Sequence, residues 1–457
     1  MSGIVSKNGG RSSGIVGAGA VGADAVDGSN IADDAIDSEH YAAGSIDEAH
    51  IADNAVTLAK MAGGTDGQII TFDASGNPSA VGPGSDGEVL TSTGAGSPPA
   101  FEAASGGDKR NYILDGAVTQ WPEGTAAVAG TGYKSALCKV TDGSSGSLTG
   151  ERSTDIPTVA QSSFQGSYSL LLKCTGTEAS MSAANYTTID LFVTGSDFTH
   201  LHQQQMTFSF WAKTAAANSG DNYNVTIMNS AANRNYIFTF APSSSWTKFT
   251  FTFTGDTSGT WLFTEADIGM RIRIALASGT DYDDGTEGSW TAGHEQWSSS
   301  GTAIGNFMDS TSNEFYITQI QLVLGATSPN FTSPPISTVI NQVQYYVQDL
   351  LNGDSDQILG SGQHIGASAD NAQLRVAMHW QKKRINNSTI STHSTTTYYN
   401  VVWENNENDV SSITGIYNIG PTGCDFRVNH AGAATVGYGG LARSSNASAT
   451  FLIDARH

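Results

Sequence analysis

Charged side chains are scarce in this chain. Asp, Glu, Lys and Arg together make up 14% of its 457 residues, whereas about a quarter is usual in soluble proteins. Gly, Ser, Thr, Ala and Asn take their place. This composition is typical of β-rich, loop-rich extracellular or virion proteins, and it argues against a cytosolic enzyme.

Basic charge is the scarcer of the two signs. The chain carries 21 Lys and Arg against 43 Asp and Glu, a formal net charge of −22, and residues 1–107 hold 14 of the acidic and 3 of the basic side chains. Because nucleic-acid binding depends on neutralising phosphates with basic side chains, this balance argues against a nucleic-acid partner. We interpret the acidic excess as a solubilising, self-repelling surface.

Cysteine, long apolar runs and an export signal are also lacking. Cys138, Cys174 and Cys424 give neither an even disulfide set nor a metal-ligand spacing, so buried thiols are expected. No apolar run reaches the length of a membrane span, so no membrane insertion is expected. The first residues contain no apolar segment of the signal-peptide kind. These absences predict assembly in a host cytoplasm followed by release, as in a virion, and no cofactor is predicted.

A period of five organises residues 16–61. Every fifth residue is branched or apolar: Val16, Val21, Val26, Ile31, Ile36, Tyr41, Ile46, Ile51, Val56 and Met61. A period of five fits neither a helix face nor a strand face. One copy would bury almost nothing, whereas several copies wound together would form a continuous thin core. The stretch is therefore predicted to be a fibrous, multi-chain shaft.

A second repeat, twenty residues long, follows the first. Gly64-Thr65-Asp66-Gly67-Gln68-Ile69-Ile70-Thr71 returns as Gly84-Ser85-Asp86-Gly87-Glu88-Val89-Leu90-Thr91. Asp-Gly favours a tight turn, and the apolar residues after it favour a short strand. Two small β-units are predicted. The two repeats in this order, over residues 16–104, resemble bacteriophage tail-fibre proteins. The resemblance implies a homotrimer, although the repeats themselves require only more than one chain.

Residues 110–333 predict a β-sandwich. Arg110-Asn111-Tyr112-Ile113-Leu114 and Gln120-Trp121-Pro122 open this region, and segments 206–213, 236–240, 246–253, 271–274 and 315–322 alternate apolar and polar residues as half-buried strands do. Gly, Asn and Ser turns separate them. The pattern resembles the carbohydrate-binding jelly rolls that follow such shafts.

A short helix and a second β-domain are predicted after Pro334-Pro335. Ser337 is a candidate N-cap, and Val339, Val343, Tyr346 and Leu350 form an apolar stripe. The helix could line a trimer axis or pack on the sandwich, and the second is favoured. From residue 355 the chain again alternates, and residues 449–457 predict a final strand, similar to the small β-domain that closes many such fibres.

No catalytic motif was found. A Gly-x-Ser-x-Gly elbow, a phosphate loop and a His-Glu-x-x-His helix are all absent from the sequence. Phage spikes that cut polysaccharide use carboxylate pairs on a long β-solenoid, and no solenoid of that length is predicted here. The sequence therefore predicts no enzyme and no catalytic residues.

Two segments are candidate metal sites. Asp281, Asp283 and Asp284 place oxygen ligands close together, as Ca²⁺ requires, although an acidic turn between strands explains them equally simply. His200 and His202 would lie on one face of an extended segment, and three copies on a trimer axis would supply six nitrogens. A solvated or core pair of histidines is the alternative.

Two segments are candidate ligand sites. Trp290, His294 and Trp297 lie in a Gly/Ser-rich loop beside the acidic turn, where an aromatic ring can stack on a sugar. Trp380 adjoins a basic cluster that suits an anionic surface polymer; its members are Lys382, Lys383 and Arg384. A loop aromatic covering the sandwich end and a solvated hairpin tip are the alternatives.

These expectations combine into one hypothesis. The predicted parts are a virion-attachment tip (1–15), a five-residue-repeat shaft (16–62), twenty-residue repeats with a hinge (63–107), a jelly roll (108–335), a short helix and linker (336–354) and a small β-domain (355–457). The predicted function is that of a phage tail fibre located in the virion, held by other tail proteins at its N-terminal end and binding a host surface glycan or protein. The alternatives are a purely structural fibre or head decoration, a polysaccharide-degrading tailspike, and a secreted bacterial carbohydrate-binding protein.

Overall fold

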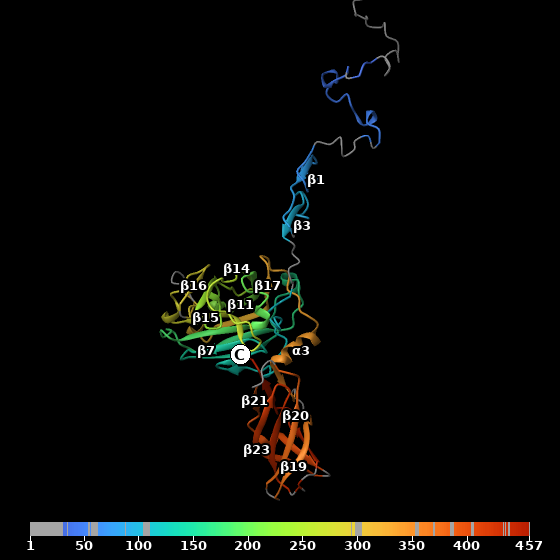
Figure 1. Cartoon of the computed structure of the whole chain (residues 1–457). Coiled ribbons are helices and arrows are strands. Elements are labelled where there is room, and N and C mark those ends of the chain that lie inside the picture. The colour runs from blue at the N-terminus through green and yellow to red at the C-terminus, as the bar shows by residue number, and fades with distance from the viewer. Residues whose placement is uncertain are drawn as a thin grey trace, which may run out of the picture. The chain divides into compact units, whose positions relative to one another are not determined.

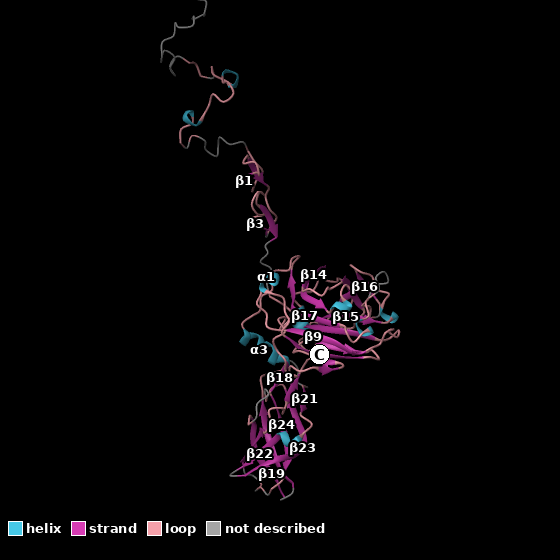
Figure 2. Cartoon of the chain, turned by 180° about the vertical axis from the view of Figure 1, so that it is seen from behind, coloured by secondary structure: helices cyan, strands magenta, loops and turns pink. Residues whose placement is uncertain are grey.

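Strands dominate the structure. The computed structural model describes residues 31–33, 35–53, 55, 63–86, 88–103, 110–293, 295–297, 304–351, 356–368, 371–383, 388–403, 406–432, 434, 436 and 439–456. Residues 1–104 and 105–457 form two units, each described here by itself. Strands are numerous and helices short in Figures 1 and 2, which confirms the prediction of a mainly β protein. Within the described residues, no helix is both long and apolar enough to cross a membrane.

A backbone turn recurs every fifth residue in the described part of the first repeat. The amides of residues 35, 40, 45, 50 and 55 each donate to the carbonyl oxygen three residues earlier, at 2.9–3.1 Å. Two of these turns are 3₁₀ helices, η1 (Ser38–His40) and η2 (Glu48–His50). Their histidines contact the preceding aspartates, with Nδ1–Oδ1 distances of 2.7 and 2.6 Å. The period of the sequence is therefore a period of the backbone. Residues 16–30 and 56–62 lie outside the described part.

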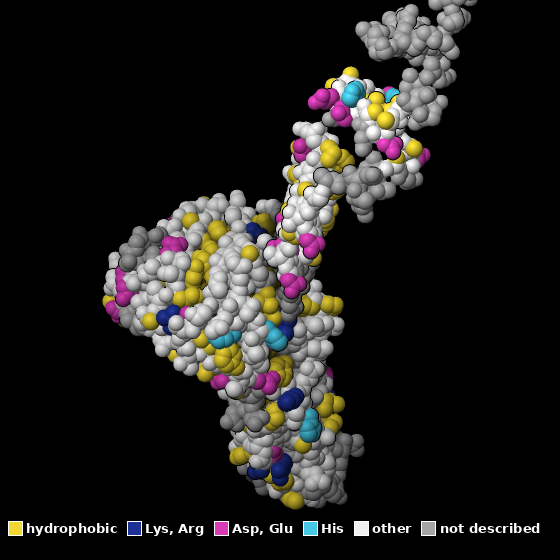
Figure 3. Space-filling view, turned by 45° about the horizontal axis from the view of Figure 1, so that its top comes forward, with side chains coloured by type: hydrophobic (Ala, Val, Ile, Leu, Met, Phe, Trp, Pro, Cys, Tyr) yellow, Lys and Arg dark blue, Asp and Glu magenta, His cyan; other side chains and the backbone are white. Residues whose placement is uncertain are grey.

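The apolar residues of this register are exposed in the single chain. Ile36, Tyr41, Ile46 and Ile51 are 44%, 49%, 48% and 44% exposed. The space-filling view shows hydrophobic and acidic side chains together at the surface of this unit (Figure 3). In the single chain, four large apolar side chains at regular spacing therefore face the solvent.

The twenty-residue repeat forms two hairpins. In the first, β1 (Ile69–Phe72) pairs with β2 (Pro78–Val81), and in the second, β3 (Glu88–Thr91) pairs with β4 (Ala100–Ala103), both antiparallel. The side chain of Gln68 accepts from the amide of Thr65 at 2.7 Å, and Glu88 accepts from Ser85 at 2.6 Å. The same local cap therefore opens both hairpins, twenty residues apart.

Two antiparallel sheets form a β-sandwich in the second unit. The first has the strand order β16 (Trp290–Ala292), β13 (Arg234–Phe240), β12 (Tyr223–Met228), β15 (Ile268–Ser278), β10 (Tyr186–Thr194), β7 (Lys139–Asp142), β6 (Gly132–Tyr133). The second has the order β14 (Thr247–Thr254), β11 (Gln205–Thr214), β17 (Glu314–Leu324), β9 (Ser169–Gly176), β8 (Ser147–Ser153), β5 (Val128–Ala129). Short helical turns connect them: α1 (Val159–Ser162), α2 (Gly195–Phe198), η4 (Ala216–Asn218), η5 (Thr280–Tyr282) and η6 (Phe307–Asp309).

One hydrophobic core lies between these sheets. On β11 the alternate residues Met206, Phe208, Phe210 and Ala212 face it, as the period of two predicts. The alternating segments that predicted strands all fall in strands of this sandwich. The jelly-roll-like, two-sheet architecture of this region is thus as the sequence predicted.

Helix α3 (Ile336–Tyr346) packs within the same unit. Val339 and Val343 are buried against Ala136 in a cluster that Leu137 and Val347 extend. The predicted N-cap at Ser337 is wrong. Pro335 occupies that position, and its carbonyl accepts from Thr338 at 2.8 Å to close the first turn.

The helix also ends earlier than predicted. Val347 is already extended and begins β18 (Val347–Asp349), since it pairs with Asp454. Leu350 therefore does not belong to the helical stripe. Helix α3 packs on the sandwich, which was the favoured of the two predictions for it.

A closed barrel follows the helix. Its strands run in the order β19 (Ile358–Ser368), β20 (Asn371–His379), β24 (Gly423–His430), β23 (Asn406–Gly420), β22 (Tyr399–Trp403), β25 (Gly439–Ser444), and η7 (Thr396–Tyr398) precedes β22. A small sheet adds β18, β26 (Phe451–Asp454) and β21 (Thr389–Thr392). The final predicted strand corresponds to β26.

Arg456 joins the end of the described chain to the start of the sandwich. Its side chain is 3% exposed and pairs with Glu123 and with Asp454, the latter at 2.7 Å. It also donates to the carbonyl oxygen of Ala136 at 3.0 Å and stacks 3.7 Å from the ring centre of Tyr133. Segments more than 300 residues apart therefore share one buried guanidinium.

Candidate functional site

The candidate site lies in the loop that follows β15. Gly279 opens the loop, and a Cβ there would lie 2.0 Å from the carbonyl oxygen of Ser182, so only glycine fits. Asp281 then donates its amide to Ala183 at 3.0 Å, and Trp297 donates its amide to the carbonyl oxygen of Tyr282 at 3.2 Å. The two ends of the loop are thereby held together over the seven-stranded sheet.

An aromatic stack forms where these ends meet. The rings of Tyr282 and Trp297 lie 4.0 Å apart at 23°, and Tyr186 approaches Trp297 at 4.9 Å. Trp297 is completely buried, whereas Tyr282 is half-buried. The outer ring of the stack is therefore Tyr282, supported from below by the indole.

A buried ion pair supports the stack. Met270, Ile272 and Ile274 of β15 face the core, so Arg273 projects from the opposite face of the sheet. Its guanidinium lies 4.3 Å from the ring centre of Trp297 and bonds Asp190 of β10 in bidentate fashion, at 2.6 and 3.2 Å. This pair fixes the indole from the side of the sheet.

The pKa values follow from this burial. Desolvation acts to lower the pKa of Arg273, but the charges of Asp190 and Glu295 outweigh it and raise that pKa. Arg271 has the opposite balance: burial and the neighbouring Arg273 lower its pKa. Desolvation raises the pKa of the Tyr282 phenol, and Tyr186 and Glu295 add to the effect. Tyr282 therefore stays neutral at physiological pH.

A hollow of about 620 Å³ adjoins the stack, lined by Thr280, Asp281, Tyr282, Asp284 and Glu295. Carboxylates accept hydrogen bonds from sugar hydroxyls, and an aromatic face contacts the C–H groups of a pyranose ring. Pockets of roughly 300–1,000 Å³ suit small ligands. The hollow has the residue types and the size to hold a sugar unit without covalent chemistry.

The structure brings together only some of the predicted residues. Trp297, Asp281 and Asp284 meet at the hollow, but Trp297 lies beneath Tyr282 and is not itself an exposed platform. Trp290 donates its indole N–H to Thr254 at 2.7 Å and packs on the sandwich core. His294 lies outside the described residues.

The predicted histidine pair is not formed. His200 and His202 follow α2 in successive turns, and the amide of His202 donates to the carbonyl of Phe198 at 3.0 Å. Side chains two apart on a helical turn point in nearly opposite directions. His200 is exposed, while His202 packs edge-on against Phe263 at 5.0 Å.

No metal centre is assembled in the part of the chain that the structure describes. There, no three His, Cys, Asp or Glu side chains converge as a metal ion would require. Asp281 and Asp284 line the hollow and Asp283 does not. These aspartates lie in an acidic turn after β15, and the Ca²⁺ site stays a prediction.

The predicted basic cluster is divided between surface and interior. Trp380 is 8% exposed and donates to the carbonyl of Pro421 at 3.1 Å. Lys382 is exposed, but Lys383 is 1% exposed and donates to the backbone of Gln344 and, at 2.9 Å, to the side chain of Gln348. The carbonyl end of the α3 dipole stabilises a positive charge at this position. Lys383 is thus not a surface contact, and Arg384 lies outside the described residues.

The burial of Lys383 predicts that the stability of the protein depends on pH. Burial lowers its pKa to about 8, below the usual 10.5. Between these values the unfolded chain binds more protons, so the stability that this group contributes rises with pH and is lowest below pH 8. Urea unfolding should give a free energy of unfolding about 2 kcal/mol higher at pH 9.5 than at pH 7. Lys383→Met should abolish this difference. Lys382→Met is the control and should keep the difference; equal curves for both variants would contradict the assignment.

Sequence reasoning missed Tyr282, Glu295, Arg273 and Asp190 as site residues. A signal existed for one of them. Arg271-Ile272-Arg273-Ile274 places two arginines on the polar face of a strand, and buried arginines require acidic partners. The partner, Asp190, stands opposite Arg273 in the register of β10 and β15.

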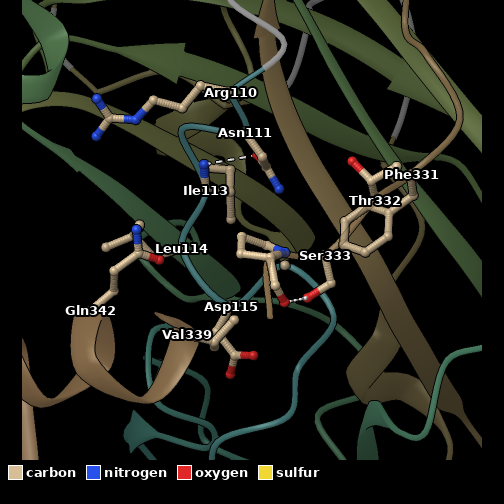
Figure 4. A pocket seen from close by; sticks show the side chains of 12 residues that line it. Arg110, Asn111, Ile113, Leu114, Asp115, Phe331, Thr332, Ser333, Val339 and Gln342 are labelled. Atoms are coloured by element: carbon tan, nitrogen blue, oxygen red, sulfur yellow. Dashed lines mark hydrogen bonds between the residues drawn. The ribbon is translucent and has the colours of Figure 1, made fainter. Parts of the chain in front are cut away.

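A second cavity, of about 240 Å³, lies beside α3 and is lined by Arg110, Asn111, Asp115, Phe331 and others (Figure 4). Burial raises the pKa of Asp115 to about 6. Its carboxylate, however, already accepts from Thr119 at 2.8 and 2.6 Å and from Gln120 at 2.8 Å. Those bonds hold a local turn, so the hollow at Tyr282 is the better candidate.

Comparisons with known proteins show no family. No family model matches the sequence, and no curated protein matches it. A CBM4 domain is 15% identical, with 34% of this chain and 71% of that chain covered and a TM-score of 0.20. The enzymatically active domain of tailspike protein 4 of bacteriophage CBA120 is 10% identical, with 41% and 19% covered and a TM-score of 0.23. A family 16 carbohydrate-binding module is 13% identical, with 35% and 80% covered and a TM-score of 0.18. TM-scores this low carry no argument, so the function is inferred from the residues of this chain.

Proposed function

We propose that this protein is a bacteriophage tail fibre that attaches the virion to a host surface by non-covalent glycan binding. The observation that carries the proposal is the half-buried ring of Tyr282, held 4.0 Å from Trp297 beside an acidic hollow. A rigid aromatic ring with carboxylates around it binds sugars without needing a metal or a cofactor. In this proposal the protein is not an enzyme.

The proposal includes a homotrimer. Ile36, Tyr41, Ile46 and Ile51 are exposed at intervals of five residues, each next to a hydrogen-bonded turn. Three such chains side by side would cover these side chains, as hydrophobic burial favours. Three copies of the hollow would then bind together, so that weak single sites produce firm retention. The N-terminal end is proposed to bind other tail proteins.

Binding to an array of purified bacterial surface polysaccharides tests the glycan site. Labelled native protein is expected to bind at least one polysaccharide, and Tyr282→Ala to weaken that binding about tenfold or more, because the stacking face is lost. Tyr282→Phe keeps the ring and should bind as the native protein does. The matched control is Tyr168→Ala, which removes a half-buried ring stacked on Arg152 at 4.3 Å, away from the hollow.

The alternatives have distinct outcomes. Native protein that binds no polysaccharide would favour a purely structural fibre or head decoration. Release of reducing ends from a bound polysaccharide would instead favour a degrading tailspike. Retained binding by Tyr282→Ala would remove the hollow at Tyr282 from the proposal.

A further inference from the structure

A further hollow, distinct from those at Tyr282 and beside α3, lies on the outer surface of the barrel. Strand β24 lies between β20 and β23, and its Asp425 pairs with Ala377 on one side and Tyr417 on the other. Small residues such as Ala377 and Gly423 leave a depression of about 410 Å³, whose lining includes Arg375, His379, Asn418, Thr422 and Asp425. A volume in this range accommodates one or two sugar units.

Two arginines meet on one carboxylate in this hollow. The Nε of Arg375 lies 2.8 Å from Oδ2 of Asp425, and Nη2 of Arg427 lies 3.0 Å from the same oxygen. Two positive charges against one negative charge leave the cluster basic, in a chain with a net charge of −22. Lys and Arg side chains reach the surface of this domain in the space-filling view (Figure 3).

The arginines differ in what they can still bind. Arg427 stacks on the ring of Tyr417 at 4.5 Å and is largely covered, with 29% of its side chain exposed. Arg375 is 50% exposed and contacts Asp425 through Nε, so about half of its side chain is open to a ligand. A guanidinium edge of this kind matches a carboxylate or phosphate.

Asp425 supplies an unused acceptor at the floor of the hollow. Its side chain is 8% exposed, and its Oδ1 is buried without a hydrogen-bond partner in the described part of the chain. Leaving a buried charged oxygen unpaired is costly.

Lys382 does not line this hollow, but its backbone lies beside a turn that does. The amide of Trp380 donates to Thr422 at 3.0 Å and that of Lys383 to Pro421 at 2.8 Å, so the exposed Lys382 between them lies beside the turn at residues 421–422. The basic residues near Trp380 in the structure are thus the exposed Lys382, Arg375 of β20 and Arg427 of β24, whereas Lys383 is buried.

We propose that the barrel hollow binds a sugar unit that carries a carboxylate or a phosphate. The anion lies against Arg375, with Lys382 nearby, and Asp425 holds the guanidinium of Arg375 in place. This assignment rests on the proposed glycan-binding function and adds the charge of the ligand. The acidic hollow at Tyr282 binds the neutral hydroxyl groups of a sugar, whereas the barrel hollow selects a sugar that carries an anionic group.

Saturation-transfer NMR on the full-length protein tests the assignment with three probes: glucuronic acid, glucose 1-phosphate and glucose. In the Tyr282→Ala protein, which lacks the other proposed sugar site, at least one anionic sugar is expected to bind, and glucose at least about tenfold more weakly. Glucuronic acid alone would identify a carboxylate, and glucose 1-phosphate alone a phosphate. Arg375→Gln, an exposed position, should weaken anion binding about tenfold or more.

The control is Arg443→Gln on the same barrel. Arg443 pairs with Asp356 and Glu407 and does not line the hollow, so its loss should leave anion binding unchanged. Equal binding of glucose in the Tyr282→Ala protein, unchanged binding by Arg375→Gln, or equal losses in Arg375→Gln and Arg443→Gln would overturn the inference. Tyr282→Ala should keep the anion signals. If that variant loses polysaccharide binding while Arg375→Gln changes nothing, only the barrel inference fails; the reverse result removes only the site at Tyr282.

Discussion

Replacing Ile36, Tyr41, Ile46 and Ile51 together by serine is expected to dissociate the protein into monomers. In the single chain each of these side chains is 44–49% exposed. Covering the exposed half of a large apolar side chain contributes about 1 kcal/mol, so the twelve side chains of a trimer contribute roughly 10 kcal/mol. Serine removes that contribution and leaves the backbone turns unchanged, because their hydrogen bonds join backbone atoms.

Light scattering at several dilutions measures this effect. The native protein is expected near three times 47.6 kDa and the serine variant towards 47.6 kDa. Serine at Ala42, Ala43, Ala49 and Ala52, which are exposed but out of register, provides the matched control and should leave the mass unchanged. A native mass of one chain, or a serine variant that keeps the native mass at every dilution, would rule out the shared core.

Arg456→Ala is expected to destabilise the second unit by about 3–5 kcal/mol, because it removes a buried guanidinium and leaves two half-buried carboxylates without their cation. Glu123 is 19% exposed and Asp454 24% exposed, and desolvation already raises the pKa of Glu123. The variant also loses the hydrogen bond to Ala136 and the stacking on Tyr133. Arg456→Lys should restore only part of the stability, since one ammonium cannot replace several guanidinium bonds.

Urea unfolding followed by tryptophan fluorescence checks this value. Arg443→Ala serves as the control, because its ion pairs with Asp356 and Glu407 are more exposed and such pairs contribute about 0–1 kcal/mol. A cost for Arg456→Ala no larger than that for Arg443→Ala would mean that the ends of the second unit are not held together by this side chain.

The strands of the sandwich could be predicted because their signal is local. Met206, Phe208, Phe210 and Ala212 alternate with other residues and face one core, so the period of two is sufficient. The barrel gave a weaker signal. Its strand β19 contains Gly360 and Gly362, and a Cβ at Gly362 would lie 1.8 Å from the carbonyl oxygen of Arg375. Close approach of two strands required glycine there and removed the apolar alternation from the sequence.

The candidate sites depend on contacts that one sequence does not reveal. The loop of Asp281 and Trp297 was found from its composition, but the burial of Trp297 beneath Tyr282 follows from the loop conformation. The pairing of Arg273 with Asp190 spans 83 residues and depends on strand register. The same holds for Arg375 and Asp425, which lie on neighbouring strands of the barrel.

The closed ring of barrel strands has a consequence for many copies kept at high concentration. Every barrel strand pairs with a neighbour on both sides, from β19 round to β25. Open sheet edges recruit strands from other molecules and start aggregation, and full closure removes those edges. We therefore expect the barrel to resist intermolecular sheet growth, so that crowded copies do not join into fibrous deposits through its strands.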